Sequence, residues 1–132
     1  IVFSYWKKTL DVVGTILQAQ NLHFYFIHGS IPHTERSQIL NRFRSSIGHS
    51  ILLMTLGTGA VGLNLGVASR IYLLEPQWNP FLEQQAFGRA QRLGQTEKVT
   101  IIRFLMKDTI EDTNVQSRQL VKMHIASRGF GN

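Results

Sequence analysis

Short apolar runs separated by helix-like segments constrain the fold of this chain more than any other feature of its sequence. The runs cover residues 2–4, 24–27, 51–54, 71–74 and 99–105. Residues 51–54 and 71–74 are apolar at every position instead of alternating with polar ones, which is typical of strands buried on both faces. The pattern therefore predicts an α/β fold with an open, mainly parallel sheet and helices on both faces.

Three of the segments between these runs have helical spacing. Apolar residues recur every three or four positions over residues 5–20 and 34–44, and a proline suited to a first helical turn opens residues 80–92. Residues 109–132 are expected to form a C-terminal helix or tail. With 132 residues, 43% of them hydrophobic, we expect one domain spanning residues 1–132 with a real core. Because the chain opens at Ile1 inside a predicted strand, we expect it to be part of a longer protein.

The chain is basic, with 14 Lys and Arg against 8 Asp and Glu, which gives a net charge of +6. Most of the basic residues are arginines, whose guanidinium groups match phosphate oxygens. A basic, solvated surface explains the charge equally well, so charge leaves both interpretations open. The absence of cysteine excludes disulfides and thiolate zinc sites. The histidines lack metal-ligand spacing, so we expect no metal site.

One uncharged stretch could be mistaken for a membrane span. Residues 51–69 carry no charge, but they contain four glycines and several polar residues. A spanning helix needs about 20 mainly apolar residues. We therefore expect a buried strand followed by a glycine loop, and no interaction with a membrane.

Residues directly after the strands are the candidates for binding, because ligands on open parallel sheets lie beyond the carboxyl ends of the strands. Three segments qualify, at residues 28–30, 55–64 and 75–80. The glycines of residues 55–64 would let a backbone approach a phosphate or a sugar. The segment is no P-loop, because the chain contains no Gly-Lys pair. A tight loop packed on its own sheet is the alternative.

Arg89 and Arg92 lie three residues apart and would share one helix face. Two such arginines can neutralise the charge that develops on a transferring phosphoryl group. A solvated, basic helix end is the alternative. Trp78 stands between two prolines just beyond a strand. It could be a stacking or partner surface, or a lid folded back on the core.

Taken together and in order, these segments resemble the C-terminal RecA-like lobe of SWI/SNF-type superfamily-two helicases, a P-loop NTPase-type lobe without its own P-loop. The resemblance runs from residue 1 to about residue 112, and its matching segments are residues 1–4, 28–30, 55–65, 75–80, 85–95 and 103–111. Residues 57–60 and 75–78 look most like fungal members of the branch that carries a RING insertion and acts in damaged-DNA tolerance.

The resemblance implies roles for particular residues. Arg89 and Arg92 would be arginine fingers reaching ATP held by another lobe, and Gln85 would help to position the nucleotide. The residues expected near the ATP ribose and the lobe interface are Gly59, Gly62 and Asn64. The residues expected to contact DNA phosphates are Ser4, Gly29, Ser30 and Thr55. Trp78 and Asn79 would couple lobe closure to the grip on DNA.

The function implied is that of the second motor lobe of an ATP-dependent double-stranded-DNA translocase, in chromatin remodelling or DNA repair. Its implied partners are duplex DNA, the N-terminal RecA-like lobe of the same full-length chain, and nucleosomes or repair proteins, in the nucleus. ATP and Mg²⁺ would be held mainly by that other lobe. This chain has no P-loop lysine and no Asp-Glu pair for Mg²⁺, so we expect it to be inactive as an ATPase alone.

Two alternatives remain open. The chain could be a non-catalytic module that binds DNA or protein. An RNA-acting DEAD-box lobe is less consistent with this sequence, because the sixth motif of that family differs from residues 88–95 of this chain.

The chain also departs from the family pattern at four positions. Gln91 stands where histidine is usual, Gly57 where lysine or arginine is usual, Ala60 where glycine is usual and Asn114 where an apolar residue is usual. Gln91 still offers a hydrogen-bond donor and an acceptor but cannot carry the charge of an imidazole. Gly57 would remove one contact to the DNA backbone.

Overall fold

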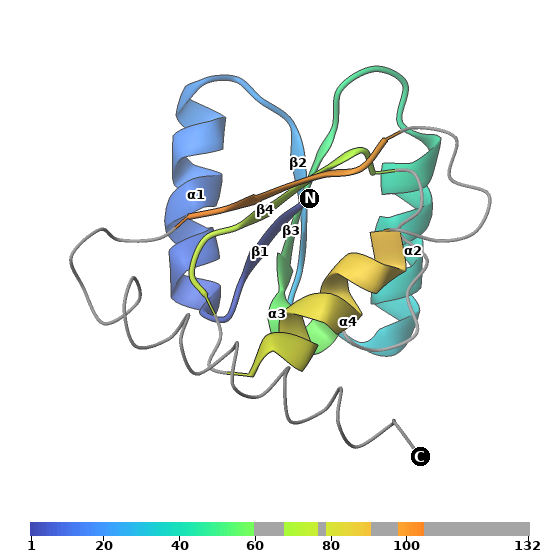
Figure 1. The fold of residues 1–132 in the computed structure, drawn as a ribbon. Helices are drawn as coiled ribbons and strands as arrows, with labels where there is room; N and C mark the ends of the chain where they lie inside the picture. Colours follow the sequence, from blue (N-terminus) through green and yellow to red (C-terminus); the bar gives the residue numbers. More distant parts are fainter. Residues whose placement is uncertain (60–67, 77–78, 91–97, 105–132) are drawn as a thin grey trace, which may run out of the picture.

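The computed structural model describes residues 1–59, 68–76, 79–90 and 98–104 (Figure 1). The strands are β1 (Val2–Ser4), β2 (Phe24–Ile27), β3 (Ile51–Thr55), β4 (Arg70–Leu73) and β5 (Thr100–Arg103). The helices are α1 (Lys7–Ala19), α2 (His33–Ser45), α3 (Leu56–Gly59) and α4 (Pro80–Ala90). Each of the five predicted strands is present. The expected C-terminal helix or tail lies outside the described residues.

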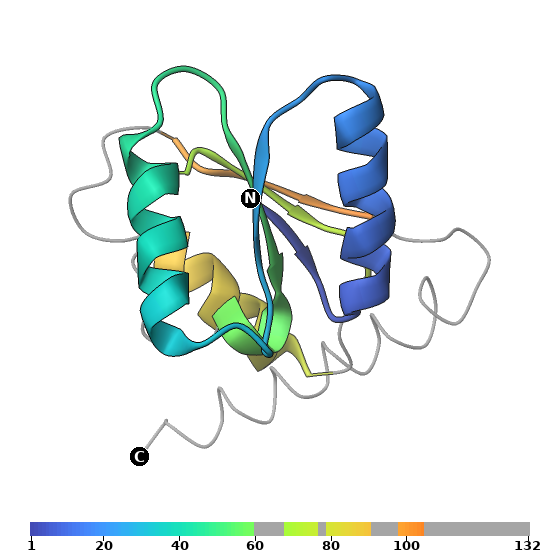
Figure 2. The same cartoon turned by 180° about the vertical axis from the view of Figure 1, so that it is seen from behind.

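The five strands form one parallel sheet in the order β2-β3-β1-β4-β5. The chain first moves from β1 outward to β2 and then reverses its direction through β3 toward β5. Because crossovers between parallel strands are right-handed, this reversal places α1 on one face of the sheet and α2 and α4 on the other. Figures 1 and 2 show this arrangement from both sides. The predicted open parallel sheet with helices on both faces is therefore confirmed.

The core is divided between the two faces of the sheet. On the side of α2, buried residues of the central strands pack against Leu40 and Phe43 of that helix. On the side of α1, the buried residues include Leu10 of the helix and Leu53 of β3. At Gly14 of α1, a Cβ atom would lie 3.0 Å from the ring of Phe24. The glycine therefore allows the helix to approach the sheet closely.

The ends of α1 differ from the predicted helix over residues 5–20. The helix ends in a Schellman motif, in which the Leu22 N–H donates to the Leu17 carbonyl at 2.9 Å and the Asn21 N–H to the Gln18 carbonyl at 3.0 Å. Asn21 takes the left-handed conformation that this motif requires, with φ of 55°. At the other end Trp6 stays extended.

The sequence predicts a glycine loop after β3, and this prediction is wrong for residues 56–59. Leu56–Gly59 form a single helical turn, α3, directly after the strand. The hydroxyls of Thr55 and Thr58 lie 2.8 Å apart and share a hydrogen bond across this turn. Leu56 is buried against the sheet, and this burial favours the turn over an open loop. Residues 60–67 lie outside the described part of the chain.

None of the helices in the described ranges has the length and apolar character needed to cross a membrane.

Candidate functional site

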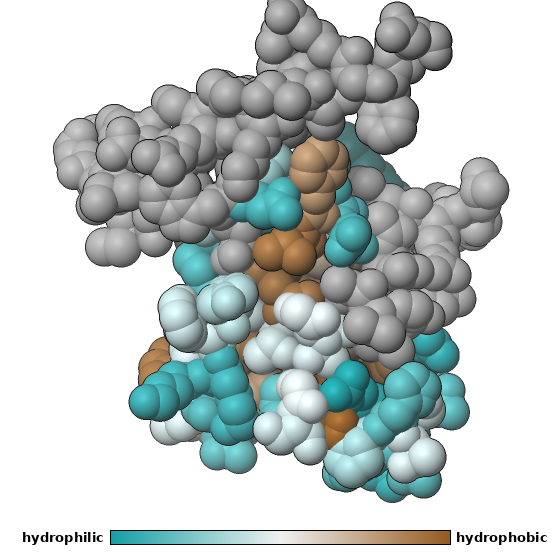
Figure 3. All heavy atoms as spheres, turned by 90° about the horizontal axis from the view of Figure 1, so that it is seen from below, coloured by the Kyte–Doolittle hydropathy of each residue, from teal (hydrophilic) through white to brown (hydrophobic). Residues whose placement is uncertain are grey.

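A pocket of about 450 Å³ lies at the carboxyl ends of the three adjacent strands β1, β2 and β3. Its lining combines cationic side chains, hydroxyls, glycines and two aromatic rings: Tyr5, Lys7, His28, Gly29, Ser30, Arg36, Thr55, Gly57 and Thr58. Figure 3 views the molecule from this edge and shows hydrophilic side chains beside an apolar strip. The edge therefore offers polar and apolar contacts together.

The turn after β2 is held by side chains. The Nδ1 atom of His28 accepts the backbone N–H of Ser30 at 3.3 Å. Arg36, from α2, donates through Nε to the Ile31 carbonyl at 2.7 Å and through Nη2 to the Gly29 carbonyl at 2.8 Å. These bonds fix the path of the loop and bring a guanidinium charge to the pocket.

His28 is held in its neutral form. Partial burial is the main cause that lowers its pKa below the usual 6.5, and the positive charge of Lys7 lowers it further. The carboxylate of Asp11 opposes that effect. A neutral imidazole leaves Nδ1 free to accept the bond from Ser30. His28 therefore shapes the turn and adds no charge to it.

The Lys7 ammonium is shared between several groups. It lies 3.1 Å from the Asp11 carboxylate, with both side chains about half exposed, and 5.8 Å from the centre of the Phe26 ring. An exposed pair of this kind contributes little to stability. Lys7 can therefore exchange Asp11 for another anion at small cost.

The pocket is open at its glycines. A Cβ atom on Gly57 would meet no atom within 4 Å, and one on Gly29 would meet only the Thr58 hydroxyl, at 3.9 Å. The usual lysine or arginine of the family pattern would therefore fit at position 57. Gly29, Ser30 and Thr55, three of the four residues expected to contact phosphates, lie together here.

Ser4 was expected to contact DNA phosphates, but its side chain does not reach the surface. The residue is 0% exposed, and its hydroxyl donates to Glu75 Oε1 at 2.5 Å. The same oxygen of Glu75 accepts the Tyr5 N–H at 2.6 Å, and the Ser4 hydroxyl accepts the Trp6 N–H at 3.1 Å. The expectation of a direct contact through the Ser4 hydroxyl is therefore corrected: burial and internal hydrogen bonds make Ser4 a support for the segment after β1.

The segment expected to couple lobe closure to DNA also starts a helix. The Asn79 side chain accepts the Phe81 N–H at 3.2 Å, and Pro80 occupies the first helical position of α4. Asn79 is therefore an N-cap, a role compatible with a further contact. Its neighbour Trp78 lies outside the described residues.

Helix α4 carries part of the expected ATP site. Gln85 is exposed on this helix, and Arg89 lies in its last turn. The Glu83 carboxylate, 5% exposed, pairs with Arg103 of β5 at 3.0 Å and ties the helix to the sheet. Gly59 ends α3. Arg92, Gly62 and Asn64 lie outside the described residues, so the structure does not place them.

The described residues do not by themselves suit Mg²⁺ and ATP. Across residues 1–59, 68–76, 79–90 and 98–104, no three His, Asp or Glu side chains gather as a metal site would require. The chain also lacks the lysine of a P-loop.

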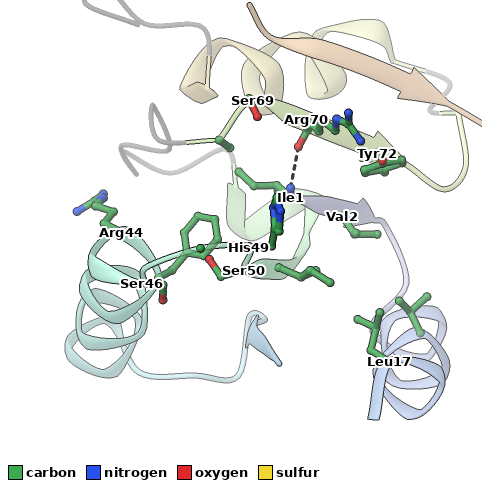
Figure 4. A pocket seen from close by; sticks show the side chains of 15 residues that line it. Ile1, Val2, Leu17, Arg44, Ser46, His49, Ser50, Ser69, Arg70 and Tyr72 are labelled. Carbon is green, nitrogen blue, oxygen red and sulfur yellow. Dashed lines mark hydrogen bonds between the residues drawn. The ribbon is translucent and has the colours of Figure 1, made fainter. Parts of the chain in front are cut away.

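A second cavity, of about 640 Å³, lies at the opposite edge of the sheet, near the amino ends of β1, β3 and β4 (Figure 4). Here the amino group of Ile1 donates to the Arg70 carbonyl at 2.8 Å, and burial lowers its pKa to about 6. Among the described residues that the sequence predicts to bind a ligand, none lines this cavity.

Lys7 and Arg36 at the first pocket escaped the sequence analysis. They reach it from α1 and α2, and no local pattern singles them out, because only the fold brings them to this edge. Thr58 and Glu75 lie in the candidate segments 55–64 and 75–80, but their individual roles at the pocket were not predicted.

The fold, with its pocket at the carboxyl ends of β1, β2 and β3, is that of a RecA-like α/β lobe. The crystal structure of the C-terminal part of the Fun30 ATPase domain superposes with a TM-score of 0.84 and 27% identity, covering 89% of this chain and 38% of that one. The model of the helicase conserved C-terminal domain matches residues 1–94. The chain belongs to this helicase C-terminal domain family, in its SWI/SNF-type branch.

The curated relatives come from plants, animals and fungi. DNA repair protein RAD5B of Arabidopsis thaliana is 40% identical over 90% of this chain. Helicase-like transcription factor of Mus musculus is 38% identical over 99%, and DNA repair protein RAD5 of Gibberella zeae is 33% identical over 100%. The chain spans only 10% to 13% of the length of these relatives.

Proposed function

We propose that this chain is the second motor lobe of an ATP-dependent double-stranded-DNA translocase. The observation that carries the proposal is the pocket at the carboxyl ends of β1, β2 and β3, where hydroxyls and cationic side chains converge. Phosphate groups are the ligands that such a lining suits. The relatives, named as DNA repair proteins and a helicase-like transcription factor, support DNA as the source of these phosphates.

In this proposal, the pocket grips the backbone of one DNA strand. Ser30 and Thr55 offer hydroxyl groups, and Gly29 lets the backbone approach closely. Lys7 and Arg36 add positive charge. Contacts to phosphates position a protein on DNA and carry no sequence information, which suits a motor that moves along any sequence.

The ATP-dependent part of the proposal rests on the resemblance. Arg89 and Arg92 would act as arginine fingers with Gln85 beside them, and Gly59, Gly62 and Asn64 would lie near the nucleotide. The N-terminal lobe of the full-length protein would hold ATP and Mg²⁺. A nuclear location, nucleosomes or repair proteins as partners, and membership of the RING-bearing damage-tolerance branch belong to the same proposal.

A gain of affinity at position 57 tests the DNA site. Because a side chain there meets open space in the pocket, Gly57→Lys should strengthen binding of duplex DNA. The slope of log K against log salt concentration should steepen by about 1, as expected for one added phosphate contact. His49→Lys is the matched control, because His49 is exposed and lies at the opposite cavity. Equal effects of the two substitutions would contradict the assignment of the pocket to DNA.

The arginines test the motor function. In a two-lobed protein that contains this chain, Arg89→Ala and Arg92→Ala should each lower the rate of DNA-stimulated ATP hydrolysis by about 10³- to 10⁵-fold. DNA binding by the same variants should change little. If the substitutions weaken DNA binding and the two-lobed protein shows no ATP hydrolysis to lose, the chain is a non-catalytic binding module instead.

A further inference from the structure

Two aromatic side chains stand exposed where β1 ends. Tyr5 is 51% exposed and Trp6 is 60% exposed. Their rings meet edge to face with centroids 4.9 Å apart. An exposed aromatic pair is costly to leave in water, and such pairs mark contact surfaces when they lie beside a polar site.

The backbone beneath this pair is firmly held. The Tyr5 N–H donates to Glu75 at 2.6 Å, and the Trp6 N–H donates to the buried Ser4 hydroxyl at 3.1 Å. The Trp6 carbonyl accepts the Leu10 N–H at 3.4 Å, at the start of α1. The segment is therefore prearranged, so a ligand that packs on the rings would lose little affinity to ordering of the backbone.

The pair adjoins the phosphate-binding pocket. Tyr5 is part of the pocket lining, together with Lys7 and Arg36, and Trp6 follows it directly in the chain. A ligand that fills the pocket with a phosphate and continues onto the rings must carry a flat or apolar group next to its phosphate. A nucleotide of duplex DNA has this composition, because the apolar C–H face of its deoxyribose adjoins its phosphate, whereas its base is paired and stacked inside the duplex.

We infer that Tyr5 and Trp6 form an aromatic platform for the deoxyribose of the DNA nucleotide whose phosphate occupies the pocket. The inference rests on the proposed function for the presence of DNA and adds a contact beyond the phosphates. The pocket supplies charge, and the platform supplies apolar contact area. The platform therefore adds affinity that does not depend on counterion release.

Substitutions of Trp6 test the platform in the 132-residue chain. Trp6→Ala should weaken binding of a short duplex DNA, measured by fluorescence anisotropy, by about 3- to 10-fold, because the apolar contact between the ring and a deoxyribose is lost. Trp6→Phe keeps a ring and should retain most of the affinity. The slope of log K against log salt concentration should stay unchanged in both variants, because no phosphate contact is lost.

Inorganic polyphosphate separates ring contacts from charge contacts. It offers phosphates without sugars or bases, so Trp6→Ala and the unsubstituted chain should bind it equally. Ile47→Ala is the surface control. Ile47 is fully exposed in the loop between α2 and β3 and is not part of the pocket lining, so the DNA affinity of this variant should not change.

The outcomes distinguish this inference from the proposed function. If the unsubstituted chain does not bind duplex DNA, the proposed function fails and the platform with it. If it binds DNA and Trp6→Ala binds equally well, only the platform is overturned, and the rings would face a protein partner. Equal losses on DNA and polyphosphate would also overturn it. Should Trp6→Ala fail to fold, Tyr5→Ala against Tyr5→Phe provides the same comparison.

Discussion

Ser4 joins the ends of two strands that are far apart in the sequence. Its hydroxyl reaches Glu75 across 71 positions of the chain, and the same carboxylate oxygen holds the Tyr5 N–H. The family resemblance implies that Ser4 contacts DNA phosphates. Its burial instead makes it a support that fixes where Tyr5 and Trp6 stand.

Replacing Ser4 should therefore affect stability. Ser4→Ala removes the hydroxyl that the Trp6 N–H and Glu75 both need, so the free energy of unfolding should fall by about 1–3 kcal/mol. Urea denaturation measures this change. Ser45→Ala, which removes an exposed hydroxyl at the end of α2, should change stability by less than about 0.5 kcal/mol. Equal values for the two variants would show that Ser4 is not a support.

His28 predicts how stability depends on pH. Its pKa is lowered in the folded chain, so the unfolded chain takes up a proton more readily as the pH falls below about 6.5. The free energy of unfolding should therefore decrease as the pH falls through this region. His28→Asn keeps an acceptor for the Ser30 N–H but cannot titrate, so its stability should decrease less.

Denaturation of the unsubstituted chain and of His28→Asn, at about pH 7.5 and about pH 5.5, measures how much stability each one loses between the two pH values. The Ile1 amino group, whose pKa is lowered to about 6, also titrates here, but it is present in both chains and cancels. Parallel pH profiles for the two chains would contradict the role given to His28.

At the scale of single elements, α4 is positioned from both sides. Asn79 caps its first turn, and Glu83 pairs with Arg103 on β5. The last turn of the same helix carries Arg89. The orientation of α4 thus depends on an ion pair between a helix and an edge strand.

Breaking this ion pair should be more costly than breaking an exposed one. Glu83→Ala leaves Arg103 without its nearly buried partner and should lower the free energy of unfolding by about 3 kcal/mol, the low end for such pairs because Arg103 is one-third exposed. Asp11→Ala, which breaks the exposed pair with Lys7 on α1, should cost less than about 1 kcal/mol. Thermal or urea unfolding checks both values, and similar losses would contradict this account.

The elements differ in how far their sequences determine them. The strands follow from apolar runs such as residues 51–54, because a buried strand in a parallel sheet needs apolar residues on both faces. The start of α1 and the turn α3 do not follow from local periodicity. Trp6 stays extended because the Ser4 hydroxyl holds its N–H, and Leu56 turns inward because the sheet offers it a buried position.

For the whole molecule, the reversal of strand order creates the candidate site. The strands β1, β2 and β3 are neighbours in space in the order β2-β3-β1, so the residues that follow each of them meet at one edge. Lys7 from α1, Arg36 from α2 and Thr58 from α3 complete the lining. The pocket is thus a product of topology, as expected for ligand sites on open parallel sheets.

The chain alone should hydrolyse no ATP. It has no P-loop lysine, and the described residues group no carboxylates as a metal site would need. A coupled phosphate-release assay with the purified 132-residue chain should therefore give the background rate, with or without duplex DNA. A two-lobed protein containing the chain is the positive control. DNA-stimulated hydrolysis by the purified chain would overturn the division of labour between the lobes.

The sequence by itself determined the fold class, the five strands and the family, because apolar runs and ordered motifs are properties of consecutive residues. It also predicted that Gly29, Ser30 and Thr55 lie at the carboxyl edge of the sheet, where the structure places them together. Only the tertiary structure decided that the Ser4 hydroxyl is buried, that Lys7 and Arg36 share the pocket, and that Glu75 supports an exposed aromatic pair. Burial and hydrogen bonding between distant segments depend on packing, and local sequence patterns do not encode it.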